Sequence, residues 1–379
     1  MNLIKSLNAV ELFAGAGGLG IGLKNAGVNI VLANEIDKIF SDTFKYNNPE
    51  TKVICEDISR IDFKNELKIL GIDSIHIVSG GPPCQGFSTV GNKNENDPRN
   101  KLFYEFLRAV SEINPYYVIF ENVSGFKNLY NGKAHEILIK NLSDLGFETV
   151  SAILDASDYG LPQIRKRTIV LGWKRFLPLV SLPKVKYSDK NKSLIGMIPK
   201  LSIMDAISDL PPLESNDSKD FYLVEPKNKY QRNLRGNQLM LTEHNSSNYG
   251  VKMKKILSLV PEGGTVNDLP VNLRPKKYFN NTYSRLLPDK PAPTITRNFG
   301  TPSSSRCIHP YQNRALSTRE GARLQGFPDD YVFLGSKTTK NLQIGNAVSP
   351  IFGKIIAEEI IKSHQNSFDK ECQIYCKLI

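Results

Sequence analysis

Strand-like and helix-like segments alternate over roughly the first 175 residues, and this alternation constrains the fold more than any other feature. Seven short apolar runs have the length and composition of β-strands, at residues 8–13, 29–34, 52–55, 75–79, 117–121, 148–154 and 168–172. Helix-like segments lie between them, near residues 18–26, 37–46, 63–70, 99–113 and 134–145. This order of elements predicts an α/β domain with a doubly wound, largely parallel sheet.

The character of the sequence changes at about residue 176, where Pro, Lys, Asn and Ser become frequent and periodicity fades. Residues 176–300 are therefore expected to form a separate, loop-rich domain or insertion. Regular patterns return at residues 317–325 and 349–362. The second of these predicts an amphipathic helix that could pack back on the first domain.

The chain carries 49 Lys and Arg against 38 Asp and Glu, a formal net charge of +11 over 379 residues. An excess of this size favours a polyanionic partner, with nucleic acid first, although a merely basic surface is the simpler alternative. No stretch approaches the ~18 uninterrupted apolar residues of a membrane-spanning helix. We therefore expect a soluble protein that does not act at a membrane.

Five cysteines are scattered along the chain, and their odd number and irregular spacing imply no disulfide framework. They are Cys55, Cys84, Cys307, Cys372 and Cys376. The last two, together with His364, are a weak candidate for a zinc site because three ligand types near one end are little more than chance. No metal is expected.

The loop after the first predicted strand contains Gly15, Gly17 and Gly20 in the spacing G-x-G-x-x-G. Glu35, at the end of the second strand, completes a pattern typical of dinucleotide-binding folds. Glu11, at the end of the first strand, argues against that interpretation because its carboxylate would repel a pyrophosphate held at the helix N-terminus.

A carboxylate at position 11 suits a ligand that has an amino group and no phosphates, and S-adenosylmethionine is such a ligand. Glu35 would then accept hydrogen bonds from both ribose hydroxyls. Asp57, at the end of the third strand, could accept one from the adenine amino group. Three ordinary acidic residues at strand ends remain the alternative.

Residues 80–88 (GGPPCQGFS) follow the fourth predicted strand directly. Cys84 should therefore lie at the same edge of the sheet as Glu11 and Glu35. The two prolines stiffen this loop, whereas the glycines allow its backbone to approach a ligand. A lone cysteine is usually a small buried hydrophobe, but one in a rigid polar loop at the ligand edge is a candidate nucleophile.

Two further candidates lie at the ends of later strands. The fifth strand ends in Glu121-Asn122-Val123, and a carboxyl group there could serve as an acid or as a hydrogen-bond partner of a heterocycle. Residues 163–167 (QIRKR) precede the last strand. Of Arg165 and Arg167, one could face the active site while the other makes a salt bridge or a phosphate contact.

Six motifs in order resemble those of the DNA (cytosine-5)-methyltransferase family. They are FAGAGG (13–18), GPPCQGFS (81–88), ENV (121–123), QIRKR (163–167), REGARLQGFP (319–328) and GNAVSP (345–350). The resemblance spans nearly the whole chain and omits only the 176–300 region, where the family is variable. It implies a methyltransferase fold, a doubly wound and mostly parallel sheet with one antiparallel strand, plus a smaller target-recognition domain.

The resemblance also implies how the chain is divided. Residues 1–175 would form the catalytic and cofactor-binding domain, completed by residues 340–379. Residues 176–339 would form the loop-rich target-recognition domain, with its variable part at about 176–300.

The family's cofactor is S-adenosylmethionine, and the resemblance assigns the residues that bind it. Phe13 would contact the adenine ring, and Glu11 would meet the methionine amino group. Glu35 would bind the ribose and Asp57 the adenine amine. The remaining cofactor-binding positions would be Gly15, Gly17, Ile58 and Asn346.

The resemblance assigns the chemistry to three residues. Cys84 would be the nucleophile, and Glu121 with Arg165 would hold the target cytosine. Contacts to the DNA substrate would come from Gln85, Ser88, Asn122 and Arg167.

The implied activity is methylation of carbon 5 of a specific cytosine in double-stranded DNA, as the modification enzyme of a bacterial restriction–modification system. We expect a cytoplasmic monomer that associates with the nucleoid through DNA, with the cognate endonuclease encoded separately. Three alternatives remain: a nicotinamide dehydrogenase, a binding module without catalysis, and a cytosine-5 methyltransferase acting on transfer RNA. The long basic region at 176–300 favours DNA over transfer RNA.

Overall fold

The computed structural model describes residues 6–83, 101–189, 196–303 and 307–377, with side chains described as far as residue 367. The chain forms two compact units. Unit 1 comprises Met1–Asp155, Lys166–Lys184 and Pro350–Ile379, and unit 2 comprises Ala156–Arg165 and Val185–Ser349.

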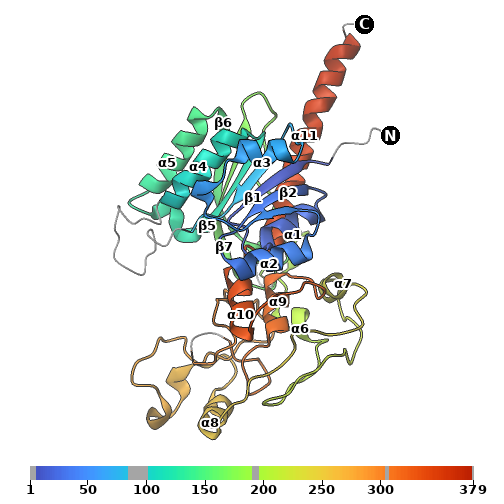
Figure 1. Cartoon of the computed structure of the whole chain (residues 1–379). Helices are drawn as coiled ribbons and strands as arrows, with labels where there is room; N and C mark the ends of the chain where they lie inside the picture. Colours follow the sequence, from blue (N-terminus) through green and yellow to red (C-terminus); the bar gives the residue numbers. More distant parts are fainter. Residues whose placement is uncertain (1–5, 84–100, 190–195, 304–306, 378–379) are drawn as a thin grey trace. The chain divides into compact units, whose positions relative to one another are not determined.

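Unit 1 is built on a seven-stranded sheet with the order β3-β2-β1-β4-β5-β7-β6 (Figure 1). Its strands are β1 (Asn8–Leu12), β2 (Asn29–Asn34), β3 (Lys52–Ile54), β4 (Ile77–Gly80), β5 (Tyr117–Val123), β6 (Phe147–Asp155) and β7 (Lys166–Lys174). Strands β1 to β5 pair in parallel, whereas β7 pairs antiparallel with both β5 and β6. All seven predicted strands are present, and the predicted fold class is confirmed.

The helices of unit 1 lie close to their predicted positions. They are α1 (Gly18–Asn25), α2 (Lys38–Asn47), α3 (Phe63–Ile69), α4 (Lys101–Ile113), α5 (Lys133–Asp144) and α11 (Pro350–Lys377), with the 3₁₀ turns η1 (Ile58–Arg60) and η4 (Ser124–Asn128). The predicted helix at 349–362 therefore continues well beyond its expected end.

Alternating side chains of the strands separate the two faces of the sheet. On one face, Val10 and Phe120 join a core cluster with Phe63 of α3, Phe106 of α4 and Leu138 of α5. Figure 1 shows these three helices together on that side of the sheet. The intervening residues of β1 point to the opposite face, toward α1, so the apolar runs are buried on both sides as a parallel sheet requires.

Helices α1 and α11 pack closely because glycines stand at their crossing. A Cβ added at Gly353 would lie 2.3 Å from the carbonyl oxygen of Leu19 and 3.0 Å from the Cα of Gly22. A Cβ added at Gly22 would lie 2.1 Å from the carbonyl oxygen of Pro350. Both clashes are with main chain, so neither could be relieved by a side-chain rotation.

Unit 2 is loop-rich, as its composition predicted. Its helices and short strands are β8 (Tyr187–Ser188), β9 (Ile198–Pro199), α6 (Ile203–Ile207), α7 (Lys229–Arg235), α8 (Val251–Leu259), α9 (Thr318–Gln325) and α10 (Lys337–Asn346). Its 3₁₀ turns are η5 (Ala156–Tyr159), η7 (Val266–Asp268) and η8 (Val271–Leu273). With so little regular structure, buried side-chain hydrogen bonds must take over much of the pairing of its backbone.

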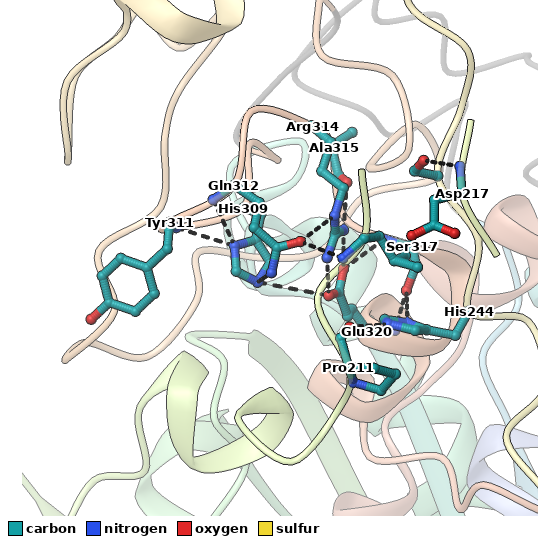
Figure 2. A network of polar contacts seen from close by, with 12 residues as sticks. Pro211, Asp217, His244, His309, Tyr311, Gln312, Arg314, Ala315, Ser317 and Glu320 are labelled. Atoms are coloured by element: carbon teal, nitrogen blue, oxygen red, sulfur yellow. Dashed lines mark hydrogen bonds and ion pairs between the residues drawn. The ribbon is translucent and has the colours of Figure 1, made fainter. Parts of the chain in front are cut away.

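One such set of hydrogen bonds is centred on Glu320 of α9 (Figure 2). Its two carboxylate oxygens each accept from the guanidinium of Arg314 at 2.7 Å, and Ser317 caps the helix in a capping box with Glu320. Burial would by itself raise the pKa of Glu320, but the Arg314 guanidinium holds it well below its ordinary value. The imidazole of His244 bonds to the Ser317 hydroxyl at 2.9 Å. Burial lowers the pKa of the nearby His309 to about 4.

A second buried set is centred on Arg323, one helical turn further along α9. Its guanidinium donates to Asp209 at 2.5 Å and to Asp329 at 2.6 Å. The hydroxyl of Tyr222 donates to the same Asp329 carboxylate, also at 2.6 Å. The REGARLQGFP motif thus supplies the polar interior of unit 2, which explains how a loop-rich unit keeps a defined fold.

The boundaries between the two units differ from the predicted domain boundaries, which were at residues 175 and 340. The segment after β7 stays with unit 1 as far as Lys184, because Ser363 of α11 donates a hydrogen bond to the carbonyl of Pro178 at 2.8 Å. Helix α10 stays with unit 2 because Asn341 accepts from the Thr318 hydroxyl of α9 at 2.8 Å. Residues 156–165, expected in the first domain, also belong to unit 2.

The crossing of α1 and α11 gives a stability prediction. Gly353→Ala forces the two helices apart and should lower the free energy of unfolding by about 1–3 kcal/mol, as overpacking does. Gly125→Ala is the matched control because a Cβ there meets nothing within 4 Å. Denaturant unfolding measures both variants, and equal midpoints for the two would contradict the role of this crossing.

Candidate functional site

Glu11 is the most deeply buried acidic residue of the predicted cofactor site. It is the last residue but one of β1, with only 1% of its surface exposed, and its Oε1 accepts a hydrogen bond from the N–H of Gly20 at 3.1 Å. Burial raises the pKa of Glu11 to about 8, and the Gly20 bond lowers it only in part. Among the described residues, its buried Oε2 has no hydrogen-bond partner. A buried oxygen of this kind suits a cationic donor.

The absence of a side chain at Gly20 makes room for this carboxyl group. A Cβ at that position would lie 2.3 Å from Oε2 of Glu11. The third glycine of the G-x-G-x-x-G pattern therefore lets helix α1 lie close against β1. No phosphate is needed to explain it.

The loop between β1 and α1 turns through three left-handed residues. Phe13 has a φ of 54°, Gly15 of 57° and Gly17 of 84°. Gly17 is the N-cap of α1, and the Phe13 ring packs partly against the core. A Cβ on Gly15 would meet nothing within 4 Å, so open space lies above the turn. A ligand could therefore approach the backbone closely at Gly15.

Glu35 follows β2 and is fixed to this turn. Its Oε2 accepts from the N–H of Gly15 at 2.8 Å, and its Oε1 accepts from the N–H of Asp37 at 2.9 Å. Burial raises the pKa of Glu35, and the two backbone donors oppose that effect. Glu35, the residue predicted to bind the ribose, is thus held against the glycine loop.

Asp57 and Ile58 follow β3. Asp57 caps η1 and accepts from the N–H and the hydroxyl of Ser59, and these bonds lower its pKa. The Ile58 side chain lies in the hydrophobic core, so any contact with a cofactor must come from its main chain.

Six of the predicted cofactor residues therefore lie at the carboxyl ends of three adjacent parallel strands, β1, β2 and β3. They are Glu11, Phe13, Gly15, Gly17, Glu35 and Asp57. The carboxyl ends of parallel strands are where α/β folds bind ligands. Asn346 is exposed at the end of α10 in unit 2, so its predicted role remains a prediction.

Glu121 of β5 forms an ion pair with Arg167 of β7. Arg167 Nε lies 2.8 Å from Glu121 Oε1, and both side chains are largely buried. In the antiparallel β5–β7 pair, Glu121 stands opposite Ile169, which places Arg167 diagonally across the same face. The antiparallel strand thus brings a guanidinium to a carboxylate at the end of the parallel sheet.

The loop that leads toward Cys84 is held beside this pair. Asn122 donates a hydrogen bond from Nδ2 to the carbonyl of Pro82 at 3.1 Å. A Cβ at Gly81 would lie 2.8 Å from Oε2 of Glu121, so the glycine allows the loop to pass close to the carboxylate. Cys84, Gln85 and Ser88 lie outside the described residues.

Arg165 has different contacts from those the sequence predicted. It is 1% exposed in unit 2, and its guanidinium donates to the main-chain carbonyls of Ile295, Gly345 and Ala347 at 2.7 to 3.2 Å. The carbonyls of Gly345 and Ala347 belong to the GNAVSP segment. The carbonyl of Ile295 belongs to an earlier segment that crosses α10. Arg165 thus acts within unit 2 as a structural link.

Two glutamines that the sequence analysis did not select complete this link. Gln163 donates to the side chain of Gln325 at 2.7 Å and accepts from the N–H of Ile295 at 2.9 Å. Gln325 in turn donates to the carbonyl of Ala347 at 2.7 Å. Both glutamines lie inside the QIRKR and REGARLQGFP motifs, so the sequence did mark these positions. A motif alone does not show whether its residues take part in packing or in the reaction.

None of the helices in the described part of the chain combines the length and the apolar character that a membrane crossing requires.

The family model for C-5 cytosine-specific DNA methylases matches residues 7–362. Among curated relatives, the Type II methyltransferase M.DdeI of Desulfomicrobium norvegicum is 36% identical over 380 residues, covering 93% of this chain and 88% of the relative. The Type II methyltransferase M1.HphI of Haemophilus parahaemolyticus is 33% identical, covering 95% and 88%.

Solved structures agree with this relationship. A DNA modification methyltransferase encoded within an E. coli prophage superposes with a TM-score of 0.77 at 28% identity, covering 95% of this chain and all of that one. DNMT2 of Spodoptera frugiperda, at 18% identity and a TM-score of 0.56 over 94% and 99% of the two chains, shares the fold. The chain therefore belongs to the C-5 cytosine-specific DNA methylase family and is a DNA cytosine-5 methyltransferase.

Proposed function

We propose that this enzyme uses S-adenosylmethionine to methylate a specific cytosine in double-stranded DNA through a covalent bond from Cys84 to the base. The observation that carries the proposal is the Glu121–Arg167 ion pair at the ends of β5 and β7. Asn122 and Gly81 hold the Pro82 loop beside that pair, and Cys84 follows Pro82 by two residues. The acid and the cation thus lie together at the ends of β5 and β7, and we assign the nucleophile to the segment that follows the Pro82 loop in the sequence.

The residues of unit 1 fit S-adenosylmethionine. Glu11 offers a buried carboxylate oxygen that lacks a partner among the described residues, which suits the amino group of the methionine moiety. Glu35 and Asp57 offer acceptors for ribose and adenine donors at neighbouring strand ends. When bound, the cofactor supplies an electrophilic methyl group. Phe13, Gly15, Gly17, Ile58 and Asn346 stay as predicted contacts.

Carbon 5 of cytosine is a poor nucleophile, and a thiolate solves this difficulty. Addition of the Cys84 thiolate to carbon 6 turns the ring into an enamine whose carbon 5 can attack an electrophile, which divides one hard step into easier ones. A base then removes the carbon 5 proton, and the thiolate leaves. A few per cent of an ordinary cysteine is ionised near neutral pH, so the addition needs help from the ring's surroundings.

Glu121 and Arg167 can provide that help. Glu121, sharing a proton with ring nitrogen 3, offsets the negative charge that builds up as Cys84 adds. We assign the exocyclic oxygen of the cytosine to Arg167, which is already paired with Glu121, in place of the sequence-based choice of Arg165. Arg165 would act indirectly, by holding the GNAVSP segment of unit 2.

The target base must leave the duplex to reach these groups, because a stacked cytosine is closed to attack at carbon 6. Flipping it out costs a few kcal/mol, which contacts to the DNA must offset. Gln85 and Ser88 follow Cys84 and stay as predicted substrate contacts. We assign recognition of the DNA sequence to unit 2, whose loop-rich composition and lysines suit a target-recognition part.

The biological role we propose is modification in a Type II restriction–modification system, with the cognate endonuclease encoded separately. Relatives named as Type II methyltransferases, at 30–36% identity over most of the chain, support this role. They do not favour the transfer RNA alternative. Action as a cytoplasmic monomer on nucleoid DNA completes the proposal.

The raised pKa of Glu11 makes cofactor binding pH-dependent. With a pKa of about 8 in the free enzyme, the carboxyl is mostly protonated at neutral pH and must lose its proton to pair with an ammonium group. Affinity for S-adenosylmethionine should therefore rise up to about tenfold per pH unit between about pH 6 and 7.5, where the ligand's own amine stays protonated. Titration calorimetry in two buffers of different ionisation enthalpy should detect proton release. Glu11→Gln should bind more weakly and without this dependence, whereas a wild type with constant affinity and no proton release would refute the assignment.

The covalent mechanism is tested by DNA that carries 5-fluorocytosine at the target position. Fluorine blocks the final proton removal, so the wild type should transfer one methyl group and stay attached through denaturing electrophoresis, in a reaction that needs S-adenosylmethionine. Cys84→Ser should form no adduct because a hydroxyl is scarcely ionised near neutral pH. Cys55→Ser, at an exposed free cysteine, is the matched control and should trap like the wild type. An adduct with Cys84→Ser would identify another nucleophile.

The two arginines should fail in different ways. Arg167→Ala should lower the kcat of the folded enzyme by about 10²–10³-fold, as loss of a group that stabilises developing charge does, and it should also lower stability because the largely buried Glu121 loses its partner. Arg165→Ala should keep most of the kcat of the folded enzyme. Arg165→Ala leaves three buried carbonyls without their donor and should cost unit 2 about 2–4 kcal/mol of stability. Calorimetric unfolding and methyl-transfer kinetics distinguish them. The opposite pattern would return the catalytic role to Arg165.

A further inference from the structure

A large part of the net positive charge of unit 2 lies in one stretch of the chain. Residues 249–285 contain seven Lys and Arg against two Asp and Glu, a net +5 out of the chain's +11. The exposed lysines of this stretch are Lys252, Lys254 and Lys255 on α8, and Lys276 and Lys277 beyond η8. Among the ion pairs of the described residues, none includes any of these five lysines.

The stretch is a rigid support because it has its own core. Tyr249, Ile256 and Leu257 from the α8 part pack against Val266 and Tyr283 from the later part. The buried guanidinium of Arg285 donates to the carbonyls of Leu257 and Val260 at the end of α8, at 2.6 and 2.9 Å. Exposed side chains on this support are therefore held in place by a packed interior.

Residues 274–280 (RPKKYFN) cross the surface of this support. Arg274 anchors the start of the segment, since its guanidinium donates to the carbonyls of Asn267 and Leu269 at 2.7 and 2.8 Å. The N–H of Thr282 closes a turn on the carbonyl of Phe279 at 2.9 Å. Between these anchors, residue Phe279 is 78% exposed and residue Tyr278 is 39% exposed.

We propose that residues 276–280 contact the DNA duplex, with Lys276 and Lys277 on phosphates and Phe279 on base edges. Unpaired lysines attract the phosphate backbone, and an apolar ring can contact a thymine methyl group in a groove. A large ring left in water on a fixed turn contributes nothing to folding. Its place next to two cations matches the needs of a surface that both binds and reads DNA.

A second exposed apolar surface of unit 2 lacks this combination. Leu239 is 82% exposed and Met240 is 59% exposed, opposite Phe221 in an isolated antiparallel bridge. Residues 217–243, which contain that bridge, carry four Asp and Glu against five Lys and Arg, a net +1 compared with +5 for residues 249–285. The larger positive charge favours the 276–280 segment as the phosphate-binding surface. Leu239 therefore provides a matched apolar control.

The lysines are tested by the salt dependence of DNA binding. The duplex carries the site found by bisulfite sequencing of wild-type products, and a second duplex lacks that site. Each neutralised phosphate contributes about −0.9 to the log–log slope, so K276A/K277A should make the slope shallower by about 1.8 and weaken binding to both duplexes. The control K64A/K68A removes the same charge from exposed positions of α3 in unit 1 and should keep the wild-type slope. A wild-type slope in K276A/K277A would overturn the proposal.

Phe279 is tested by discrimination between sites. Phe279→Ala should lower kcat/KM on the enzyme's own site by about 5- to 150-fold and relax discrimination against single-base variants, with the salt slope unchanged. Leu239→Ala should behave like the wild type. If Phe279→Ala discriminates no differently from Leu239→Ala, the base contact is refuted.

This inference rests on the proposed role of unit 2 in target recognition, and the two can fail separately. All variants must bind S-adenosylmethionine and unfold like the wild type, which exposed positions permit. A wild type that transfers no methyl group to DNA would refute the proposed function itself. A wild type that methylates a defined site, with lysine and Phe279 variants equal to their controls, would refute the 276–280 contact alone.

Discussion

The antiparallel insertion of β7 between β5 and β6 is the constraint on which the rest of this enzyme depends. Because β7 runs against β5, its first residues lie beside the last residues of β5, and Arg167 comes to pair with Glu121. The same insertion attaches unit 2, since the chain leaves unit 1 after Asp155, returns at Lys166 and leaves again after Lys184. A single strand thus sets the charged pair at the ends of β5 and β7, and the chain on both sides of it leads into unit 2.

Much of the fold could be predicted because strand–helix alternation and apolar runs are local properties. The strands at 8–12 and 29–34 and the acidic residues at their ends follow from such patterns. The hydrogen bond from the N–H of Gly15 to Glu35 joins residues 20 apart and does not follow from them. The choice between Arg165 and Arg167 could not be predicted in this way. It depends on where the chain passes from unit 2 into β7, between Arg165 and Lys166. This is a tertiary property, and two arginines separated by one residue do not encode it.

Not every motif that identifies a family takes part in its reaction. Arg323 and Glu320 of the REGARLQGFP segment are buried in ion pairs with Asp209, Asp329 and Arg314, which hold a unit with little regular secondary structure. Removing the partner of a buried charge costs much stability. Substitution of one of these residues is therefore expected to lower stability strongly, even far from the reacting atoms. Sequence reasoning gave this segment no role, because a buried ion pair and a catalytic one use the same residue types.

The glycine crossing of α1 and α11 has a consequence for how the enzyme comes into being. Helix α1 ends at Asn25 and follows the glycine loop, whereas the helix that packs on it begins at Pro350. During synthesis, the loop and α1 are therefore made long before their packing partner. A nascent chain that has not yet reached Pro350 would hold this loop without the support of α11.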